Sequence, residues 1–436
     1  MTLTNFPNGI SSFGIPILGT AGLPIFNQSA GNMWFVSSVS GNNGNDGSFS
    51  TPFATLAFAL QYSKLVAGDV IVVMEGHVEA VTAAGTATAG ILASTANVQI
   101  IGLGTGTTAP TFNFTTATTA TFKVTGAGVT IQGLRFVNGI ASLATTLDIQ
   151  AVDVLVSGNY FVEGASTTGL SFINFVLATA NASDRTRIIN NTFYNPTSGN
   201  YNHAIGLTTV HDNIEIAGNY IVGNFALSGI HNVTGKVLTN VNVHDNYVKN
   251  LTAAKPALNF ISAVTGVAYR NVLEPGDSTV NSAKFGTVLD ASGNNIGING
   301  NLNAGSEFWL TKAGVVSSTV TQAGVDMTVA SIGGAIAIKD VILKTNGTGL
   351  AGMTNFTIVT NNANGAVTFV SQAASGLGAN VTLQLSAMGT THSETILETG
   401  KKITLKATVA DGTGAGTIDI HLLCQRLTAG ADVSLA

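Results

Sequence analysis

Charged side chains are scarce in this chain of 436 residues. Asp, Glu, Lys and Arg make up 9% of it, against roughly 25% in ordinary globular proteins. The net charge is −5 and no basic stripe is present, so we expect binding to neither nucleic acid nor an anionic membrane. A single cysteine, Cys424, excludes an internal disulfide framework and cysteine-rich metal sites. It lies in an apolar run, which predicts a buried core position.

Long apolar runs and targeting signals are also missing. There is no run of roughly eighteen apolar residues, so no segment is expected to span a membrane. The first residues contain neither a cationic region nor a compact apolar region, which predicts that there is no secretory signal. We therefore expect synthesis in a host cytoplasm and release by another route, such as lysis. The abundant residues are glycine, 51 in number, with Asn, Thr and Ser, which indicates many turns.

One short pattern recurs between residues 129 and 274. Alternating apolar residues are followed by Gly, Asn or Asp, then by Asn, an outward residue and a large apolar residue. Counted at the Asn position, the spacings are 25, 32, 28 and 27 residues, from 134 to 159, 191, 219 and 246. Recurrence over this length indicates a solenoid, and period-two alternation makes each unit strand-based. Loops of different length that leave the coils account for the variable spacing.

Stacking the units in register predicts a parallel β-helix with two inward columns and one turn column. The columns are, in order, Ile131, Val156, Ile188, Ile216 and Val243; Phe136, Phe161, Phe193, Ile221 and Val248; and Asn159, Asn191, Asn219 and Asn246. At such a turn, asparagine tolerates a left-handed backbone and can hydrogen-bond to its equivalents in the neighbouring coils.

Residues 34–80 are predicted to close the N-terminal end of the solenoid. A strand and a Gly/Asn-rich loop precede Thr51 and Pro52, which are expected to open a capping helix over residues 53–65. Gly68 and Asp69 end this helix, and residues 70–74 return as a strand. The apolar face of the helix would cover the bare first coil and its unpaired strand edges.

This order of elements resembles the start of right-handed parallel β-helices of the pectate-lyase-like superfamily, and most of all those of bacteriophage tailspikes and other virion proteins. The resemblance implies an all-β fold, with a right-handed parallel β-helix over residues 34–304, and a homotrimer. It says little about chemistry, because the fold carries lyases, hydrolases and inert fibres alike. No phosphate loop, catalytic elbow or zinc spacing is present, so neither a cofactor nor a metal is predicted.

The two flanking regions lack the repeat. Residues 1–33 hold isolated apolar residues between Gly, Pro and Asn, which predicts an arm that docks onto a partner; a disordered tail is the alternative. By the resemblance, the partner is a major capsid protein or a tail hub. Residues 305–436 contain about eight alternating strands, the first near 315–321, which predicts a jelly-roll-like β-sandwich. The anchoring candidates in the arm are Phe6, Ile10, Phe13, Ile15, Ile17, Leu18 and Phe26.

Carboxylates are the groups with which polysaccharide-cutting β-helices act. The weak candidates here are Asp212, Glu215 and Asp245. In the stacked register, however, Glu215 and Asp245 occupy different columns, and Arg187 lies beside Glu215. An ordinary surface ion pair between Arg187 and Glu215 is the expected result. We therefore assign no catalytic residue.

Two further groups of residues lie in the repeat region. His203, His211, His231 and His244 are expected to be loop residues that hydrogen-bond to backbone rather than metal ligands. Tyr220 and Tyr247 face outward from adjacent coils. They are candidates for glycan contact, with cross-strand stabilisation as the simpler alternative.

These observations predict a structural bacteriophage protein on the virion surface. The favoured role is capsid decoration, as a cement protein or head fibre that also contacts host glycans, and enzymatic activity is left open but not favoured. The alternative is a tailspike that binds and cuts a host surface polysaccharide. A secreted adhesin is a third hypothesis, which the missing export signal disfavours.

Overall fold

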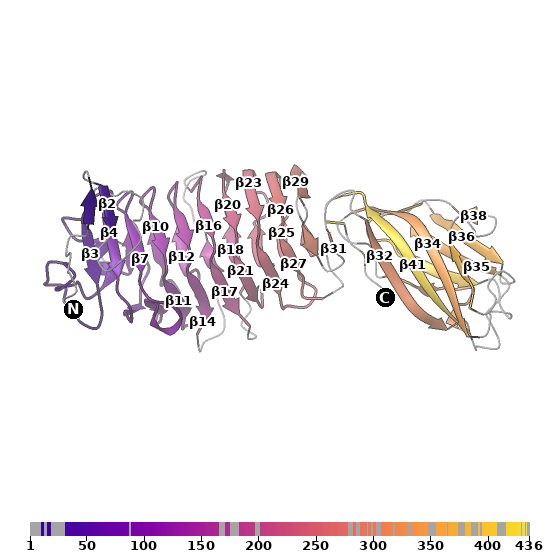
Figure 1. The fold of residues 1–436 in the computed structure, drawn as a ribbon, viewed down its shortest axis with the longest axis horizontal. Helices are drawn as coiled ribbons and strands as arrows, with labels where there is room; N and C mark the ends of the chain where they lie inside the picture. Colours follow the sequence, from indigo (N-terminus) through magenta and orange to yellow (C-terminus); the bar gives the residue numbers. More distant parts are fainter. Residues whose placement is uncertain are drawn as a thin grey trace.

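The structure of the chain is a computed structural model in which strands dominate, and one short α-helix and one 3₁₀ helix, Gly106–Thr108, occur among the described residues. Figure 1 shows a long stack of parallel strands followed, along the same axis, by a second group of longer strands. Of the described residues, no helix is long and apolar enough to cross a membrane. The described residues are 10–12, 15–18, 31–86, 89–164, 171–174, 183–196, 201–277, 282–284, 288–293, 295–297, 300–301, 307–316, 319–328, 331, 334–347, 355–363, 365–373, 380–384, 391–392, 395–407, 416–428, 430–431 and 433.

Successive coils contribute strands to three sheets that are parallel apart from the last strand of one of them, β31, which confirms the predicted parallel β-helix. Sheet I contains β3 (Met33–Val36), β4 (Val70–Val73), β7 (Gln99–Gly102), β10 (Thr130–Gln132), β13 (Leu155–Ser157), β16 (Arg187–Ile189), β20 (Glu215–Ala217), β23 (Leu238–His244), β26 (Val264–Tyr269) and β29 (Val288–Gly293), with β19 (His211–Asp212) beside β23. Sheet II contains β5 (Val78–Val81), β8 (Thr111–Phe114), β11 (Arg135–Asn138), β14 (Tyr160–Glu163), β17 (Thr192–Asn195), β21 (Tyr220–Gly223), β24 (Tyr247–Asn250), β27 (Val272–Glu274), β30 (Ile296–Gly297) and β31 (Gly300–Asn301). Sheet III contains β6 (Ile91–Ala93), β9 (Phe122–Val124), β12 (Leu147–Ile149), β15 (Ser171–Asn174), β18 (His203–Leu207), β22 (Ile230–Asn232), β25 (Leu258–Phe260) and β28 (Ala283–Lys284).

The two inward columns predicted from the repeat are present. Each member pairs with the next one along the chain, and every member is fully buried. In the second column the ring centroids of Phe136 and Phe161 lie 4.8 Å apart, and those of Phe161 and Phe193 4.7 Å apart. Because stacked aromatic rings bury large apolar areas, this file of side chains forms much of the solenoid core.

The turn column is a ladder of buried asparagines. From Asn191 onward, each Oδ1 accepts hydrogen bonds from the backbone N–H and the Nδ2 of the ladder residue one coil earlier, at 2.8 to 3.2 Å. The ladder also extends beyond the prediction, to Asn271 and Asn295. The left-handed backbone lies one residue earlier than expected, for example at Asn190 and Gly218, whose φ angles are 55° and 64°. The ladder side chains thereby stay free to point inward.

The capping helix is shorter than predicted. α1 spans Leu56–Leu60 and its N-cap is Thr55, so Thr51 and Pro52 do not open it. Phe53 is extended instead, because it forms a bridge to Val36 of β3. Leu56 and Leu60 are buried in the same core as the coils, so the helix does cover the first coil.

Glu79 of β5 holds the N-terminus of α1 through its carboxylate. Its carboxylate accepts hydrogen bonds from the backbone N–H groups of Leu56, at 2.6 Å, and Ala57, at 3.2 Å. His77 Nδ1 accepts from the N–H of Ser38, so the ring proton is on Nε2, which lies 3.1 Å from Glu79 Oε2. These contacts satisfy donors that a helix N-terminus otherwise leaves free.

The C-terminal strands form two antiparallel sheets with one core between them, which confirms the predicted sandwich. Its first strand starts earlier than the predicted 315–321, because inward alternation already begins at Phe308 and Leu310. Cys424 is fully buried, as expected. One sheet contains β32 (Glu307–Val316), β41 (Gly416–Arg426), β34 (Ile336–Gly347), β37 (Thr382–Gln384) and β39 (Thr395–Leu397). The other contains β33 (Val325–Asp326), β40 (Ile403–Ala407), β35 (Asn355–Asn362), β36 (Gly365–Ala373) and β38 (Thr391–His392).

The predicted arm is described in part. β1 (Ile10–Ser12) pairs antiparallel with β2 (Ile15–Leu18), where no strand pair was expected. The candidates Phe6, Phe13 and Phe26 lie outside the described residues. The anchoring role and the boundaries after residues 33 and 304 stay predictions.

Replacing one ladder residue tests the role of the column. Asn219→Ala removes the acceptor for the buried N–H of Asn191 and the donor to the carbonyl of Ile188. We expect a loss of roughly 2–4 kcal/mol in the free energy of unfolding, measured by urea denaturation. The control is Asn190→Gly, which changes an exposed left-handed position and should alter stability by under about 0.5 kcal/mol. Equal effects of the two changes would contradict the ladder's role.

Candidate functional site

The three candidate acids lie on one side of the solenoid, at and beside sheet I. Glu215 is on β20 and pairs in register with Asn242, as predicted, while Asp245 follows β23. Arg187 and Glu215 form the expected ion pair. The sequence did not predict that His244 lies between the two acids, with Nε2 3.2 Å from Glu215 Oε1 and Nδ1 2.7 Å from Asp245 Oδ2.

The other partners of Asp245 complete this cluster. Arg270 donates to both carboxylate oxygens, from Nε at 2.7 Å and from Nη2 at 2.6 Å. The ring of Tyr269 stacks on His244 at 4.8 Å, and the guanidinium of Arg270 lies 4.9 Å from the Tyr269 centroid. Asp212 is separate from the cluster and accepts hydrogen bonds from Thr239 and Asn240, each at 2.8 Å.

All three carboxyl groups are held in their ionised form. Hydrogen bonds from Arg270 and then His244 lower the pKa of Asp245. Partial burial acts to raise the pKa of Glu215, but hydrogen bonds from Arg187 and His244 outweigh it and the pKa is lowered. Hydrogen bonds from Thr239 and Asn240 lower the pKa of Asp212. Glycoside cleavage needs one carboxyl group with a raised pKa to protonate the leaving oxygen, and none of these three is suited to that task.

Aromatic side chains gather on a different surface, the outer face of sheet II. Four of the chain's seven tyrosines lie there. Tyr160, Thr192, Tyr220 and Tyr247 form one row across four successive coils, and Tyr194 lies in the next row. Tyr160, Tyr194 and Tyr220 are 39%, 46% and 47% exposed. We call Tyr160, Tyr194, Tyr220 and Tyr247 the tyrosine face.

Half of the tyrosine face was identified from the sequence. Tyr220 and Tyr247 stack as predicted, with centroids 5.2 Å apart and planes within 11°. Tyr160 follows a ladder asparagine just as they do, so the repeat already contained the signal for it. Tyr194 was missed because it lies two residues beyond the corresponding position, which Thr192 occupies.

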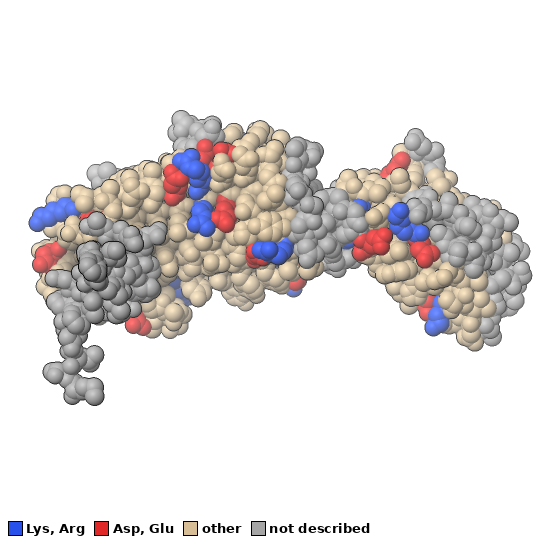
Figure 2. All heavy atoms as spheres, turned by 45° about the horizontal axis from the view of Figure 1, so that its top comes forward, with Lys and Arg blue, Asp and Glu red and all other residues tan. Residues whose placement is uncertain are grey.

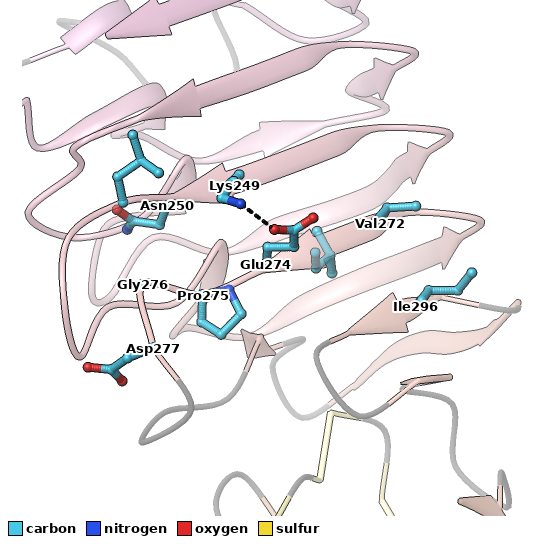
Figure 3. Close-up of a pocket in the computed structure, with 10 residues that line it drawn as sticks. Lys249, Asn250, Val272, Glu274, Pro275, Gly276, Asp277 and Ile296 are labelled. Carbon is cyan, nitrogen blue, oxygen red and sulfur yellow. Dashed lines mark ion pairs between the residues drawn. The ribbon is translucent and has the colours of Figure 1, made fainter. Parts of the chain in front are cut away.

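An open hollow of about 530 Å³ adjoins the tyrosine face, between β24 and β27. Figure 3 shows Lys249 and Glu274 pointing toward each other within it, with Pro275 and Ile296 nearby. Lys249 Nζ is 2.8 Å from Glu274 Oε2, and the hydroxyl of Tyr247 donates to Glu274 Oε1 at 2.8 Å. The hydrogen bond between Tyr247 and Glu274 therefore connects the hollow to the row of tyrosines.

The ion pair in the hollow holds both of its groups in their charged forms. The hydrogen bond from Lys249 lowers the pKa of Glu274, and Glu274 in turn raises the pKa of Lys249. Glu274 is then a carboxylate and Lys249 an ammonium at neutral pH. The lowered pKa makes Glu274 a weaker base and the raised pKa makes Lys249 a weaker acid than usual, and the pair presents hydrogen-bonding groups of opposite charge.

The histidines were predicted wrongly as loop residues. His203, His211, His231 and His244 all lie in strands. His211 is buried, and its ring contacts two side-chain hydroxyls, Ser183 Oγ at 2.9 Å and Thr209 Oγ1 at 3.1 Å. Among the described residues, no group of three or more His, Cys, Asp or Glu side chains is arranged to hold a metal ion.

Most of the remaining surface is uncharged. Figure 2 shows lysines and arginines adjoining acidic residues in small groups on an otherwise neutral face. Arg185 and Asp153 form such a pair, with contacts of 2.7 and 2.8 Å. No large field of one sign therefore marks the visible face as an electrostatic binding site.

Comparison with known proteins gives structural likeness only. No family model matches the chain, and no curated protein does. A GH136 lacto-N-biosidase from Eubacterium ramulus is 14% identical with a TM-score of 0.38, over 59% of this chain and 57% of that one. The tailspike of E. coli bacteriophage HK620, solved with a pentasaccharide, is 12% identical with a TM-score of 0.33, over 83% and 65%. Tailspike gp49 of Acinetobacter baumannii bacteriophage Fri1, a capsular polysaccharide depolymerase, is 10% identical with a TM-score of 0.20, over 99% and 93%.

This chain thus spans only 57% of the length of the lacto-N-biosidase. Identities of 10 to 14% and TM-scores of 0.20 to 0.38 are too low to transfer a function. A functional conclusion has to rest on the residues of this chain.

The buried His211 predicts a specific acid sensitivity. Burial lowers its pKa to about 4, below the value of roughly 6.5 in an unfolded chain. Between these values the unfolded state binds the proton and the folded state does not, so stability falls as the pH falls. The contribution is roughly 1.4 kcal/mol for each pH unit.

His211→Gln should remove that contribution. Urea denaturation of both proteins between pH 7.5 and pH 4 should give a shallower decline for the variant. Above pH 7 the two curves should run parallel, since His211 is neutral in both states there. Parallel curves over the whole range would refute the assignment.

Proposed function

We propose that this chain is a glycan-binding spike of a bacteriophage virion, in which the solenoid presents the tyrosine face to a host surface polysaccharide. The observation that carries the proposal is the placement of Tyr160, Tyr194, Tyr220 and Tyr247 on one outer sheet, beside an open hollow. This choice favours the receptor-binding part of the tailspike hypothesis over a purely structural capsid cement.

Tyrosine suits this role for a physical reason. Its ring is a rigid, flat apolar surface with a hydroxyl at the rim, and little conformational entropy is lost when it is contacted. A sugar ring has the complementary character, with apolar C–H faces and polar edges. Tyr160 and Tyr247 are three coil steps apart, which is roughly 14 Å at ordinary strand spacing. The face therefore offers a linear glycan several contacts along the axis.

The hollow supplies the polar end of the proposed site. Lys249 provides donors and Glu274 provides acceptors, both already oriented by their mutual ion pair and by Tyr247. Few, well-placed polar groups beside an apolar surface are typical of specific ligand sites. The chemistry favours binding over cleavage, since the candidate acids Asp212, Glu215 and Asp245 and the hollow's Glu274 all have lowered pKa values.

The remaining parts of the proposal come from the sequence. The resemblance of residues 34–80 to phage β-helices supports a virion origin and a homotrimer on the particle surface. The apolar residues of the arm suit attachment to a major capsid protein or a tail hub. The sandwich is then the projecting module.

Alanine substitutions test the tyrosine face. Tyr220→Ala and Tyr247→Ala should each weaken binding to a recognised polysaccharide by about tenfold, which corresponds to about 1.4 kcal/mol. Binding is first identified on an array of purified bacterial surface polysaccharides and then measured by titration calorimetry. The matched control is Tyr269→Ala, an aromatic side chain on sheet I, which should bind as the wild type does. Unchanged affinity in the two test variants would reject the site.

The same samples test cleavage. We expect no release of reducing ends from a bound polysaccharide. If reducing ends do appear and Glu215→Gln or Asp245→Asn abolishes them, the protein is a depolymerase and the cluster on sheet I is its active site.

Removal of the arm tests attachment. The deletion should end at residue 30, because the N–H of Asn32 and the indole of Trp34 are both bonded to Asp69 within the first coils. The truncated protein should keep its glycan affinity but no longer sediment with virions depleted of the native protein. Retention on the particles would show that another part of the chain attaches it.

A further inference from the structure

Arg135 on sheet II differs from the other four arginines of the chain in its contacts. Three of those four form ion pairs with carboxylates, and Arg426 donates to the carbonyl of Ala431 and lies over the ring of Phe308. Within the described part of the chain, no hydrogen bond, ion pair or ring contact involves the guanidinium of Arg135. Charged residues are only 9% of this sequence, and the other arginines all have partners. An open guanidinium is therefore an exception that points to a ligand.

The register places Arg135 in the same row as three residues of the tyrosine face. Arg135 of β11 pairs with Tyr160 of β14, and the row continues through two further coils to Tyr247. Phe136 is fully buried in the inward column while Arg135 is partly exposed, so the side chain of Arg135 points outward. At ordinary strand spacing Arg135 is about 5 Å from Tyr160 and about 19 Å from Tyr247 along the axis. One linear ligand along the tyrosine face therefore also reaches the guanidinium.

The charge of Arg135 is not balanced on the outer face of sheet II. The only acids in the strands from β5 to β24 are Glu79 and Glu163, and both lie in the rows that alternate with the outward ones. The other cation on this outer face, Lys249, already has the counter-charge of Glu274. A protein of net charge −5 therefore presents one unbalanced positive charge beside its tyrosines.

The chemistry of a guanidinium restricts the group that can bind to it. A guanidinium is permanently charged and only donates hydrogen bonds, so its partner must be an acceptor. When a ligand covers such a cation, the loss of its water is offset best by an opposite charge with good hydrogen-bond geometry. Carboxylate and phosphate groups meet both needs, because two of their oxygens accept from the fork of N–H groups at once.

We propose that Arg135 determines specificity for acidic polysaccharides, by binding the carboxylate or phosphate group of one sugar unit while other units lie on the tyrosine face. This inference rests on the proposed glycan binding and narrows the class of ligand. The hollow at the other end of the face does not favour an anion, since its lysine is paired with Glu274. Neutral polysaccharides are then weaker ligands of the same face.

The test compares matched ligands on the full-length protein. A uronic-acid-containing polysaccharide is titrated before and after its carboxyl groups are reduced to alcohols, and a phosphodiester-linked polysaccharide distinguishes phosphate from carboxylate as the anion. The wild type should bind one of the acidic polymers at least about tenfold more tightly than the reduced one. Arg135→Gln should lower this preference to under about threefold and leave the affinity for the reduced polymer unchanged, because only the charge-assisted contact is lost.

Two further variants separate the contributions. Lys64→Gln removes the same charge from an exposed position near the capping helix and should keep the preference of the wild type. Tyr220→Ala should weaken binding of the acidic and the reduced polymer alike, since both lie on the tyrosine face. Thermal unfolding of each variant confirms that it is folded.

The outcomes distinguish this inference from the proposed function. Equal affinity of the wild type for the acidic and the reduced polymers, or a preference that Arg135→Gln retains, overturns the role of Arg135. Weaker binding by Tyr220→Ala would still uphold the tyrosine face in that case. Absence of binding to every polysaccharide on the array overturns the proposed function, and this inference with it.

Discussion

The register between neighbouring coils is the constraint on which the structure depends. Neighbouring coils are bonded through the sheets, and the coils from Asn159 to Asn295 also through one asparagine at each turn between sheets I and II. From Asn191 onward, the Oδ1 of each ladder asparagine accepts from both the backbone and the side chain of the previous one, so a slip of one residue would leave several buried donors unpaired at once. The file of stacked phenylalanines reinforces the same register from inside the core. The asparagine ladder and the file of phenylalanines each correspond to one repeated position in the sequence.

The same stacking accounts for the scarcity of charge. An outward residue has its equivalents directly above and below at roughly 4.8 Å, so a repeated charge would repel itself along the whole rod. Several charged residues of the solenoid form pairs of opposite sign between adjacent coils, such as Arg187 with Glu215 and Lys249 with Glu274. Uncharged polar residues and tyrosines fill the other outward positions. A surface of this kind favours contacts through rings and hydroxyls over contacts through net charge.

The sequence predicted what is periodic and missed what is not. The columns around Ile131 and Phe136 and the asparagine ladder follow from spacing alone, because equivalent residues must be neighbours in a solenoid. The start of the capping helix did not follow, since Phe53 is drawn into a bridge with Val36 that local propensity cannot show. The bridging position of His244 depends on side-chain rotamers, which the repeat does not determine. Tyr194 was not predicted to belong to the tyrosine face, because it lies two residues after the repeat position that Thr192 occupies.

The order of parallel strands is interrupted differently at the two ends of the solenoid. At the N-terminal end α1 packs over the first coil and is held there by Glu79. At the other end β31 turns back to run antiparallel to β30. A stack of parallel coils with open ends would accept further strands from other molecules, as amyloid does. Covering the first coil and reversing the last strand of sheet II both interrupt the pattern that a further parallel strand would continue, so the length of the solenoid follows from the number of coils in the sequence.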